Sequence, residues 1–113
     1  MEKPYIVVVS SDQMCVGEKE IGVQLMKAFI HKLTEQEELP EKVLLYNMGA
    51  HLGIEGSDCL EDLQFLAEKG TWIGTCGTCA NYYEIEDKIA VGEVTNMGQI
   101  LKDMASYDRV VQP

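Results

Sequence analysis

Short apolar runs alternate with helical patterns along the whole chain, and this alternation constrains the fold more than any other feature of the sequence. The run Tyr5–Val9 is rich in β-branched residues, which is typical of a strand buried inside a sheet. Further strands are predicted at 42–46, 71–74, 88–91 and 109–111, and helices at 18–37, between Ser57 and Gly70, and from Asn96 to 105. Strands that alternate with helices predict an α/β fold with a five-stranded parallel sheet and helices on both faces.

The composition indicates a single domain, 1–113, with an acidic surface. A length of 113 residues leaves little room for a second core, and 46% of the residues are hydrophobic. The formal net charge is -10, from nine basic and nineteen acidic residues, so we expect no binding to nucleic acid. Arg109 is the only arginine, and phosphoryl transfer usually relies on arginine, so that chemistry is also disfavoured.

The sequence predicts a protein of the reducing cytoplasm. No apolar run approaches the roughly 20 residues that a membrane-spanning helix needs, so no membrane association is expected. The segment Met1–Pro4 leads directly into the first strand, without the apolar region and cleavage site of a signal peptide. The four cysteines are therefore expected to be reduced, with catalytic or metal-binding roles favoured over structural disulfides.

Cysteine and histidine residues gather at one edge of the predicted sheet. Right-handed crossovers place every loop that leads from a strand to a helix at the same edge, where ligands bind in open α/β folds. Cys59 is expected at this edge because it lies in the first turn of the second predicted helix, which begins there. The loops add the candidate cleft-lining residues Cys15, Asn47, Gly49, His51, Gly77 and Thr78, together with Cys76 and Cys79. We therefore expect the chemistry of this chain at that edge.

The segment Cys76-Gly77-Thr78-Cys79 carries the strongest chemical signal, because it directly follows the third predicted strand. A thiol beside free backbone N–H groups at a helix start has a lowered pKa and is more often the nucleophilic thiolate. The amides of Gly77 and Thr78 are expected to stabilise anionic sulfur there. The alternative without chemistry is that Cys76 and Cys79 are small apolar residues that fill a tight loop.

Two other uses of the cysteines compete with a nucleophilic role. A thioredoxin-type dithiol needs a proline facing the pair, and none of Pro4, Pro40 and Pro113 can do so. A structural zinc site usually has two ligand pairs, whereas this chain has one, so we expect no metal and no other cofactor. His51 either polarises or protonates a sulfur species or is a solvent-exposed loop residue.

Matches to a known family extend over nearly the whole chain, and Cys76-Gly77-Thr78-Cys79 is the most specific of them. The other matching stretches are 16–22, 25–29, 39–40, 46–49, 55–57, 91–94 and 96–97, with Leu52 and Tyr83. In these residues the chain resembles the DsrE/DsrF/TusD-like family, and most closely the DsrE-like domain of YedF-type proteins, which are linked to sulfur and selenium metabolism. The resemblance implies a three-layer α/β/α sandwich around a five-stranded parallel sheet.

The resemblance also implies a role for Cys76. The relay cysteine of this family follows the third strand and carries sulfane sulfur as a persulfide, and Cys76 holds that place here. Cys79 stands where other members often have a small residue, and family members are commonly oligomeric. YedF-type proteins usually carry an N-terminal TusA-like domain with Cys-Pro-x-Pro, which this sequence lacks, so the chain is expected to be a stand-alone or a truncated member.

We therefore predict a cytoplasmic sulfur carrier or sulfurtransferase-like protein. Cys76 accepts sulfur, or selenium, as a persulfide from a donor such as a TusA-like protein and passes it to an acceptor thiol, while Cys79 resolves or assists. An apolar fourth strand and helix faces rich in Met and Leu predict a homo-oligomer. Two alternatives stay open: a dithiol/disulfide redox or sensor protein that uses Cys76 and Cys79, and a non-catalytic oligomeric binding module of the same fold.

Overall fold

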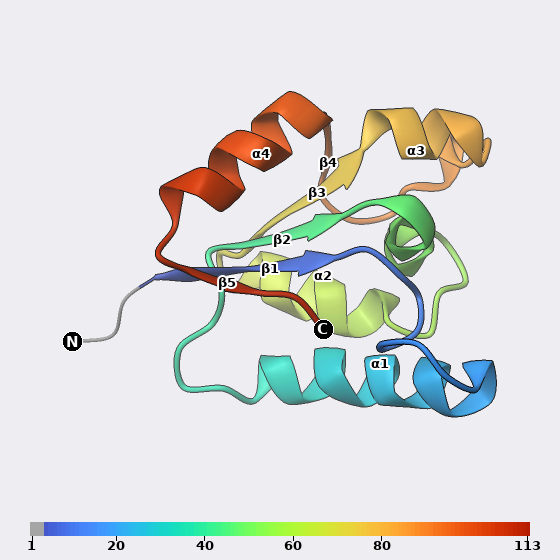
Figure 1. Ribbon diagram of the computed structural model, residues 1–113, viewed down its shortest axis with the longest axis horizontal. Coiled ribbons are helices and arrows are strands. Elements are labelled where there is room, and N and C mark those ends of the chain that lie inside the picture. The colour runs from blue at the N-terminus through green and yellow to red at the C-terminus, as the bar shows by residue number, and fades with distance from the viewer. Residues whose placement is uncertain (1–3) are drawn as a thin grey trace.

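The computed structural model describes residues 4–113 and shows one parallel sheet flanked by helices. The strands are β1 (Tyr5–Val9), β2 (Lys42–Leu45), β3 (Trp72–Cys76), β4 (Glu93–Thr95) and β5 (Arg109–Val111). The helices are α1 (Lys19–Thr34), α2 (Leu60–Glu68), α3 (Gly77–Tyr82) and α4 (Met97–Ser106), with the 3-10 helices η1 (Asn47–Gly53) and η2 (Glu86–Lys88). The strand order is β4-β3-β2-β1-β5, and every pairing between these strands is parallel (Figure 1). The predicted five-stranded parallel sheet is therefore confirmed.

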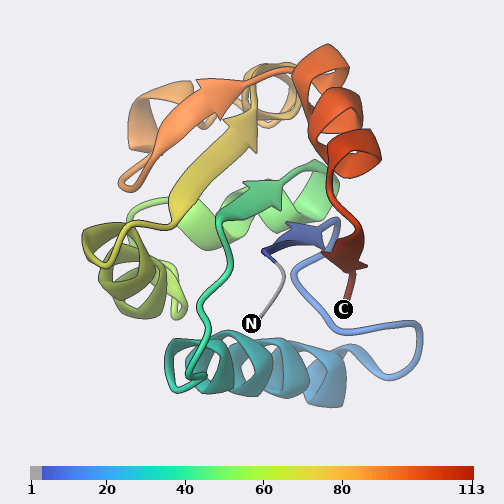
Figure 2. The same cartoon turned by 90° about the vertical axis from the view of Figure 1, so that its left-hand side faces the viewer.

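Helices cover both faces of the sheet and give the molecule three layers. α1 and α2 lie against one face, and α3 and α4 lie on the other (Figures 1 and 2). Successive side chains of a strand point to opposite faces, so Val7 and Val9 pack with α1 and α2, while Ile6 and Val8 pack with α4. All four side chains are fully buried. The three-layer α/β/α sandwich is thus confirmed as well.

The helices follow the apolar spacing of the sequence. The buried residues of α1 are Gly22, Met26, Ile30 and Leu33. Full burial of a large apolar side chain such as Ile30 contributes about 1.5–3 kcal/mol relative to exposure. α4 begins at the predicted cap, where the Asn96 side chain accepts a hydrogen bond from the Gln99 N–H at 2.8 Å. Within residues 4–113, no helix is long and apolar enough to cross a membrane.

The fourth strand does not lie where the sequence predicted it. The prediction of a strand at 88–91 is wrong: Ile89 forms only an isolated antiparallel bridge, and β4 begins after Gly92. Gly92 has φ 75°, and its backbone approaches the Ile73 carbonyl so closely that a Cβ atom would clash there. The apolar run therefore packs into the protein before this turn, and the more polar segment after the turn pairs with β3 as an edge strand.

The other element boundaries differ from the prediction by a few residues. β3 extends beyond the predicted strand 71–74 and ends at Cys76, so Cys76 belongs to the sheet itself. α1 is shorter than the predicted helix 18–37. Ser57 does not cap α2 directly, because its Oγ accepts a hydrogen bond from the Cys59 N–H at 3.0 Å in the turn that precedes the helix.

Candidate functional site

Cys76 and Cys79 lie together where β3 passes into α3. Cys76 is 1% exposed and packs against side chains of β1, β2 and α4. Cys79 lies in the first turn of α3, is partly buried, and packs against the apolar cluster that contains Cys76. Both thiols are free of disulfides. The site therefore consists of a buried inner thiol and an outer thiol nearer the surface.

A backbone amide from a neighbouring loop reaches the outer thiol. The N–H of Asn47, the first residue of η1, donates a hydrogen bond to Cys79 Sγ at 3.0 Å. The Asn47 Oδ1 atom accepts a hydrogen bond from the hydroxyl of Tyr83, the residue that follows α3, also at 3.0 Å. Asn47 has φ 53°, a left-handed conformation that asparagine tolerates better than most residues. η1 and α3 are thus joined at two points beside the cysteine pair.

The surroundings of Cys79 act on its pKa in opposite directions. Burial is the largest influence and raises the pKa of the Cys79 thiol, and the neighbouring Cys76 thiol raises it further. The Asn47 N–H lowers the pKa of the same thiol, because this donor stabilises the sulfur anion. The net direction is upward, so the lowered pKa that the sequence predicted for a thiol at this helix start does not hold for Cys79.

His51 contacts the site through Tyr83. The ring centroids of His51 and Tyr83 are 4.5 Å apart in an edge-to-face arrangement. His51 Nδ1 lies 3.1 Å from the Met48 carbonyl oxygen, and because a carbonyl only accepts, we assign the ring proton to Nδ1. His51 therefore supports the ring of Tyr83, whose hydroxyl holds Asn47.

Two glycines allow close approach around the pair. The backbone of Gly49 lies against the Val9 carbonyl at the end of β1, where a Cβ atom would clash, so η1 packs directly onto the sheet edge. Gly77 begins α3, and a Cβ atom built there would lie 3.0 Å from the Val94 side chain. Thr78 is exposed in the first turn of the same helix.

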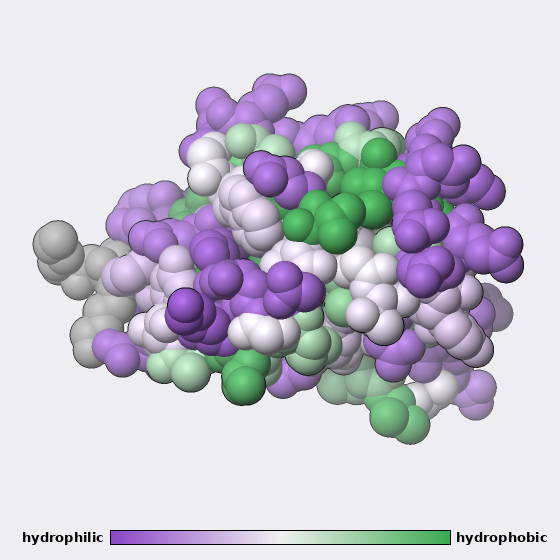
Figure 3. Space-filling model, turned by 90° about the horizontal axis from the view of Figure 1, so that it is seen from above, coloured by the Kyte–Doolittle hydropathy of each residue, from purple (hydrophilic) through white to green (hydrophobic). Residues whose placement is uncertain are grey.

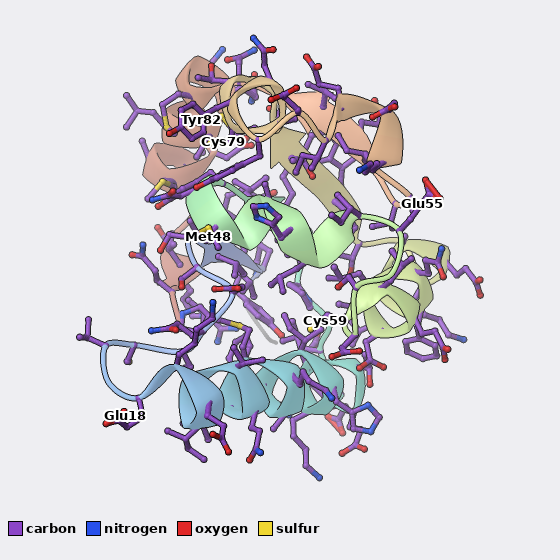
Figure 4. All side chains as sticks on the ribbon, turned by 90° about the vertical axis from the view of Figure 1, so that its right-hand side faces the viewer. Glu18, Met48, Glu55, Cys59, Cys79 and Tyr82 are labelled. Atoms are coloured by element: carbon purple, nitrogen blue, oxygen red, sulfur yellow. The ribbon has the colours of Figure 1, made fainter. Side chains whose placement is uncertain are left out.

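The other two cysteines are separate from the pair. Cys59 is 2% exposed on the α1/α2 side of the sheet, and burial, followed by the carboxylates of Asp62 and Asp58, raises its pKa to about 11. Cys15 is exposed in the loop after β1 and has φ 60°. Figure 4 shows Cys59 and Cys79 on opposite sides of η1. All four cysteines therefore lie at the expected edge of the sheet, but η1 separates Cys59 from the Cys76–Cys79 pair.

The part of the sheet edge where Cys59 lies also holds a small hollow. Its volume is about 240 Å³, and its lining includes Asp12, Lys27, His51 and Cys59. In the part of the chain from 4 to 113, no group of three or more His, Cys, Asp and Glu side chains is arranged to hold a metal ion. The Cys76–Cys79 thiol pair stays the candidate site for chemistry at this edge.

Sequence reasoning missed two contacts of this site. It placed Asn47 at the edge, but it did not identify the hydrogen bond from the Asn47 N–H to Cys79 or the one from the Tyr83 hydroxyl. The only local signal is an asparagine directly after a strand, since asparagine often adopts the left-handed conformation in turns. Such a signal indicates a turn and says nothing about which atom the amide reaches.

Comparison with known structures shows that the fold is shared. The ychN protein from E. coli matches with a TM-score of 0.75 at 16% identity, over 99% of this chain and 100% of that one. MTH1491 from Methanobacterium thermoautotrophicum matches with a TM-score of 0.73 at 17% identity, over 99% and 100%. BT1422 from Bacteroides thetaiotaomicron matches with a TM-score of 0.62 at 10% identity, over 96% and 94%. The last two are described as proteins of unknown function.

These matches establish the fold and leave the activity open. No protein-family model matches the chain, and no curated protein matches it. At the identities observed, a structural match shows a common fold and no more. The chain has the DsrE-like fold that the sequence resemblance implied, while its assignment to the YedF type stays a prediction.

Proposed function

We propose that this chain is a cytoplasmic, sulfurtransferase-like relay protein that carries sulfane sulfur, or selenium, as a persulfide on Cys76. The observation that carries the proposal is the pair of thiols at the end of β3, the buried Cys76 and the partly buried Cys79. The backbone N–H of Asn47 donates a hydrogen bond to Cys79. The DsrE-like fold and the Cys76-Gly77-Thr78-Cys79 motif support it.

The relay consists of two displacement steps at sulfur. In loading, the Cys76 thiolate attacks the outer sulfur of a donor persulfide, so that a bond to Cys76 forms, the donor S–S bond breaks, and the donor leaves as a thiolate that takes up a proton. In delivery, an acceptor thiolate attacks the outer sulfur and Cys76 leaves as a thiolate. A TusA-like protein is a suitable donor or acceptor, because it would present its sulfur on a thiol.

The burial of Cys76 suits a carrier and limits how it is reached. A persulfide at this position is shielded from water and from unrelated thiols, because the thiol is 1% exposed. A donor therefore reaches Cys76 only when side chains that pack around it, Cys79 among them, move aside. The Cys79 thiolate can also attack Cys76 Sγ of the persulfide, which forms a disulfide and expels hydrosulfide. A thiol reductant from the cytoplasm would then restore the pair.

A dithiol/disulfide redox or sensor function is the second candidate. It is favoured by one observation, the packing of two free thiols, Cys76 and Cys79, in the same cluster. A redox protein would cycle between the dithiol and the Cys76–Cys79 disulfide without ever holding an additional sulfur atom.

Intact mass spectrometry after incubation with a persulfide donor tests the proposal. We expect the wild type to gain one sulfur atom, Cys76→Ser to lose this gain, and Cys79→Ser to load but to differ in release. Cys59→Ser is the matched control, because Cys59 is equally buried on the other face, and it should load like the wild type. Loading of Cys76→Ser at the wild-type rate would contradict the assignment. Reversible disulfide formation without loading would favour the redox function, and inert thiols would favour a binding module.

We also propose that the chain forms a homo-oligomer. Val94, Met97 and Leu101 are 60%, 50% and 65% exposed, which is unusual for apolar side chains on neighbouring elements. Figure 3 shows apolar surface near the start of α4 and α3. The chain would cover this surface with a second copy. Light scattering at micromolar concentration should give a dimer or a larger assembly, and a monomer there would contradict this.

A further inference from the structure

The loop around Asn47 is fixed to the end of β1 from both sides. The Tyr46 N–H donates a hydrogen bond to the Val9 carbonyl at 3.1 Å, and the Gly49 N–H donates to the Tyr46 carbonyl at 2.9 Å. Gly49 in turn lies so close to the Val9 carbonyl that only glycine fits. The chain therefore has little freedom at Asn47, and its left-handed conformation is part of the loop geometry that places the N–H group against Cys79.

A second set of contacts ties Asn47 to the helix that carries Cys79. The Tyr83 hydroxyl donates to Asn47 Oδ1 at 3.0 Å, and the Tyr83 N–H donates to the Cys79 carbonyl at 3.0 Å. The Tyr83 ring lies edge-on against His51, at 4.5 Å, and against Tyr82, at 5.1 Å. In Figure 4, α3 with Cys79 lies next to η1 with Met48. Tyr83 is thus a link between the sulfur and the amide that faces it.

We propose that Asn47 stabilises negative charge on Cys79 Sγ through its backbone N–H, and that Tyr83 is the positioning residue that keeps this N–H aimed at Cys79. The proposal rests on the proposed function in one respect, since it takes the Cys79 thiolate to act in the release of sulfur from Cys76. Asn47 itself makes and breaks no covalent bond. The N–H group is 3.0 Å from Cys79 Sγ in the resting protein, so it needs no rearrangement when charge develops.

The balance of influences on Cys79 explains why such a donor is needed. Burial and the Cys76 thiol both disfavour a charge on Cys79, and the Asn47 N–H opposes them. The other titratable groups that pack around the amide and the sulfur are His51 from η1 and Tyr83 and Tyr82 at the end of α3. None of these is a permanent cation, so the amide is the fixed dipole that favours the anion.

Substitutions at Asn47 separate the backbone conformation from the side chain. Asn47→Gly removes the contact with Tyr83 but permits the left-handed backbone, whereas Asn47→Val removes the same contact and strongly disfavours that backbone. The measurement is the alkylation rate of each cysteine as a function of pH, read by peptide mass spectrometry. Cys15, which is exposed in another loop, serves as the internal reference in every sample.

We expect Asn47→Val to slow alkylation of Cys79 at neutral pH about tenfold and to displace its pH profile upward, because a hydrogen bond to a charged group is lost. Asn47→Gly and Tyr83→Phe should each slow it only about twofold, because the N–H can still reach the sulfur. Equal Cys79 profiles for Asn47→Val and Asn47→Gly would overturn the proposal.

A second measurement covers the case in which Asn47→Val does not fold. In the wild-type protein, the Asn47 amide proton should shift in the NMR spectrum with the same midpoint as the ionisation of Cys79, and an amide that does not respond would overturn the proposal. Neither experiment uses a persulfide donor. A wild type that fails to load sulfur but shows these effects would therefore contradict the proposed function and leave this inference standing.

Discussion

Cys59 and Cys76 are both almost fully buried at the same edge of the sheet, yet their surroundings differ. Cys59 packs with the apolar α1/α2 layer, and its burial and two nearby carboxylates raise its pKa to about 11. Cys76 packs on the opposite face, where Cys79 offers a second thiol and Asn47 offers an N–H donor to that thiol. Two cysteines at the same sheet edge can therefore have very different surroundings, and only the Cys76 side combines a partner thiol with an N–H donor to that thiol.

The alternation of side chains along the strands produces this difference. Trp72 and Cys76 of β3 pack on the α3/α4 side, and Ile73 packs on the α1/α2 side. A shift of one residue in β3 would place Cys76 on the face where Cys59 lies. The register of β3 with β2, which pairs Ile73 with Val43, is therefore what directs Cys76 toward Cys79.

The largest expected contrast between the two faces is in thiol reactivity. A pKa of about 11 for Cys59, against 9.0 for an ordinary thiol, leaves about a hundredfold less thiolate at neutral pH. Cys59 should therefore alkylate at least about a hundredfold more slowly than the exposed Cys15, as measured by peptide mass spectrometry on one sample. If Cys59 reacted as fast as Cys15, its buried, acidic surroundings would not suppress its reactivity in the way described.

The same thiol should make the protein less stable in alkali. Above pH 9 the unfolded chain loses the Cys59 proton that the folded protein keeps until about pH 11, so stability that is present below pH 9 is lost across this window. The loss in the free energy of unfolding is on the order of 2–3 kcal/mol. Urea titrations across the window should show a shallower fall for Cys59→Ala. Parallel curves for the two proteins would refute this contribution.

A smaller effect is expected from the ion pair that anchors α4 on the face of the cysteine pair. Lys42 Nζ lies 3.0 Å from the Oδ1 atom of Asp103, a carboxylate that is only 5% exposed, and Gln99 also donates to it at 3.0 Å. Asp103→Ala leaves Lys42 without this partner and should cost about 1–3 kcal/mol in urea titrations. Adding Lys42→Ala should cost less than the sum of the single changes, whereas strict additivity would show that the pair is not coupled.

Much of the fold could be predicted because it depends on local patterns. The run Tyr5–Val9 and the cap at Asn96 are visible in the sequence, and the structure has β1 and the start of α4 at these places. The fourth strand could not be located, because an edge strand pairs on one side only and needs no apolar run. The same reasoning placed Cys76 at the end of a strand. It did not predict that Cys59 would lie on the other side of η1 from the Cys76–Cys79 pair.

The finer geometry of the site depends on contacts that no local pattern contains. The N–H of Asn47 reaches a sulfur 32 residues further along the chain, from a loop in which Asn47 has a positive φ angle. The hydroxyl of Tyr83 reaches Asn47 across 36 residues. Both contacts follow from how η1 packs onto α3, so the candidate cysteines were predictable and the groups that act on them were not.

The most direct test of the account is to map where sulfur resides after a brief exposure of the wild-type protein to a persulfide donor. Peptide mass spectrometry reads all four cysteines in one sample, so the two faces of the sheet are compared under identical conditions. If Cys76 is the relay cysteine, the added sulfur is found on Cys76 and Cys59 stays unmodified. Sulfur found predominantly on Cys59 or Cys15, or on no cysteine at all, would contradict it.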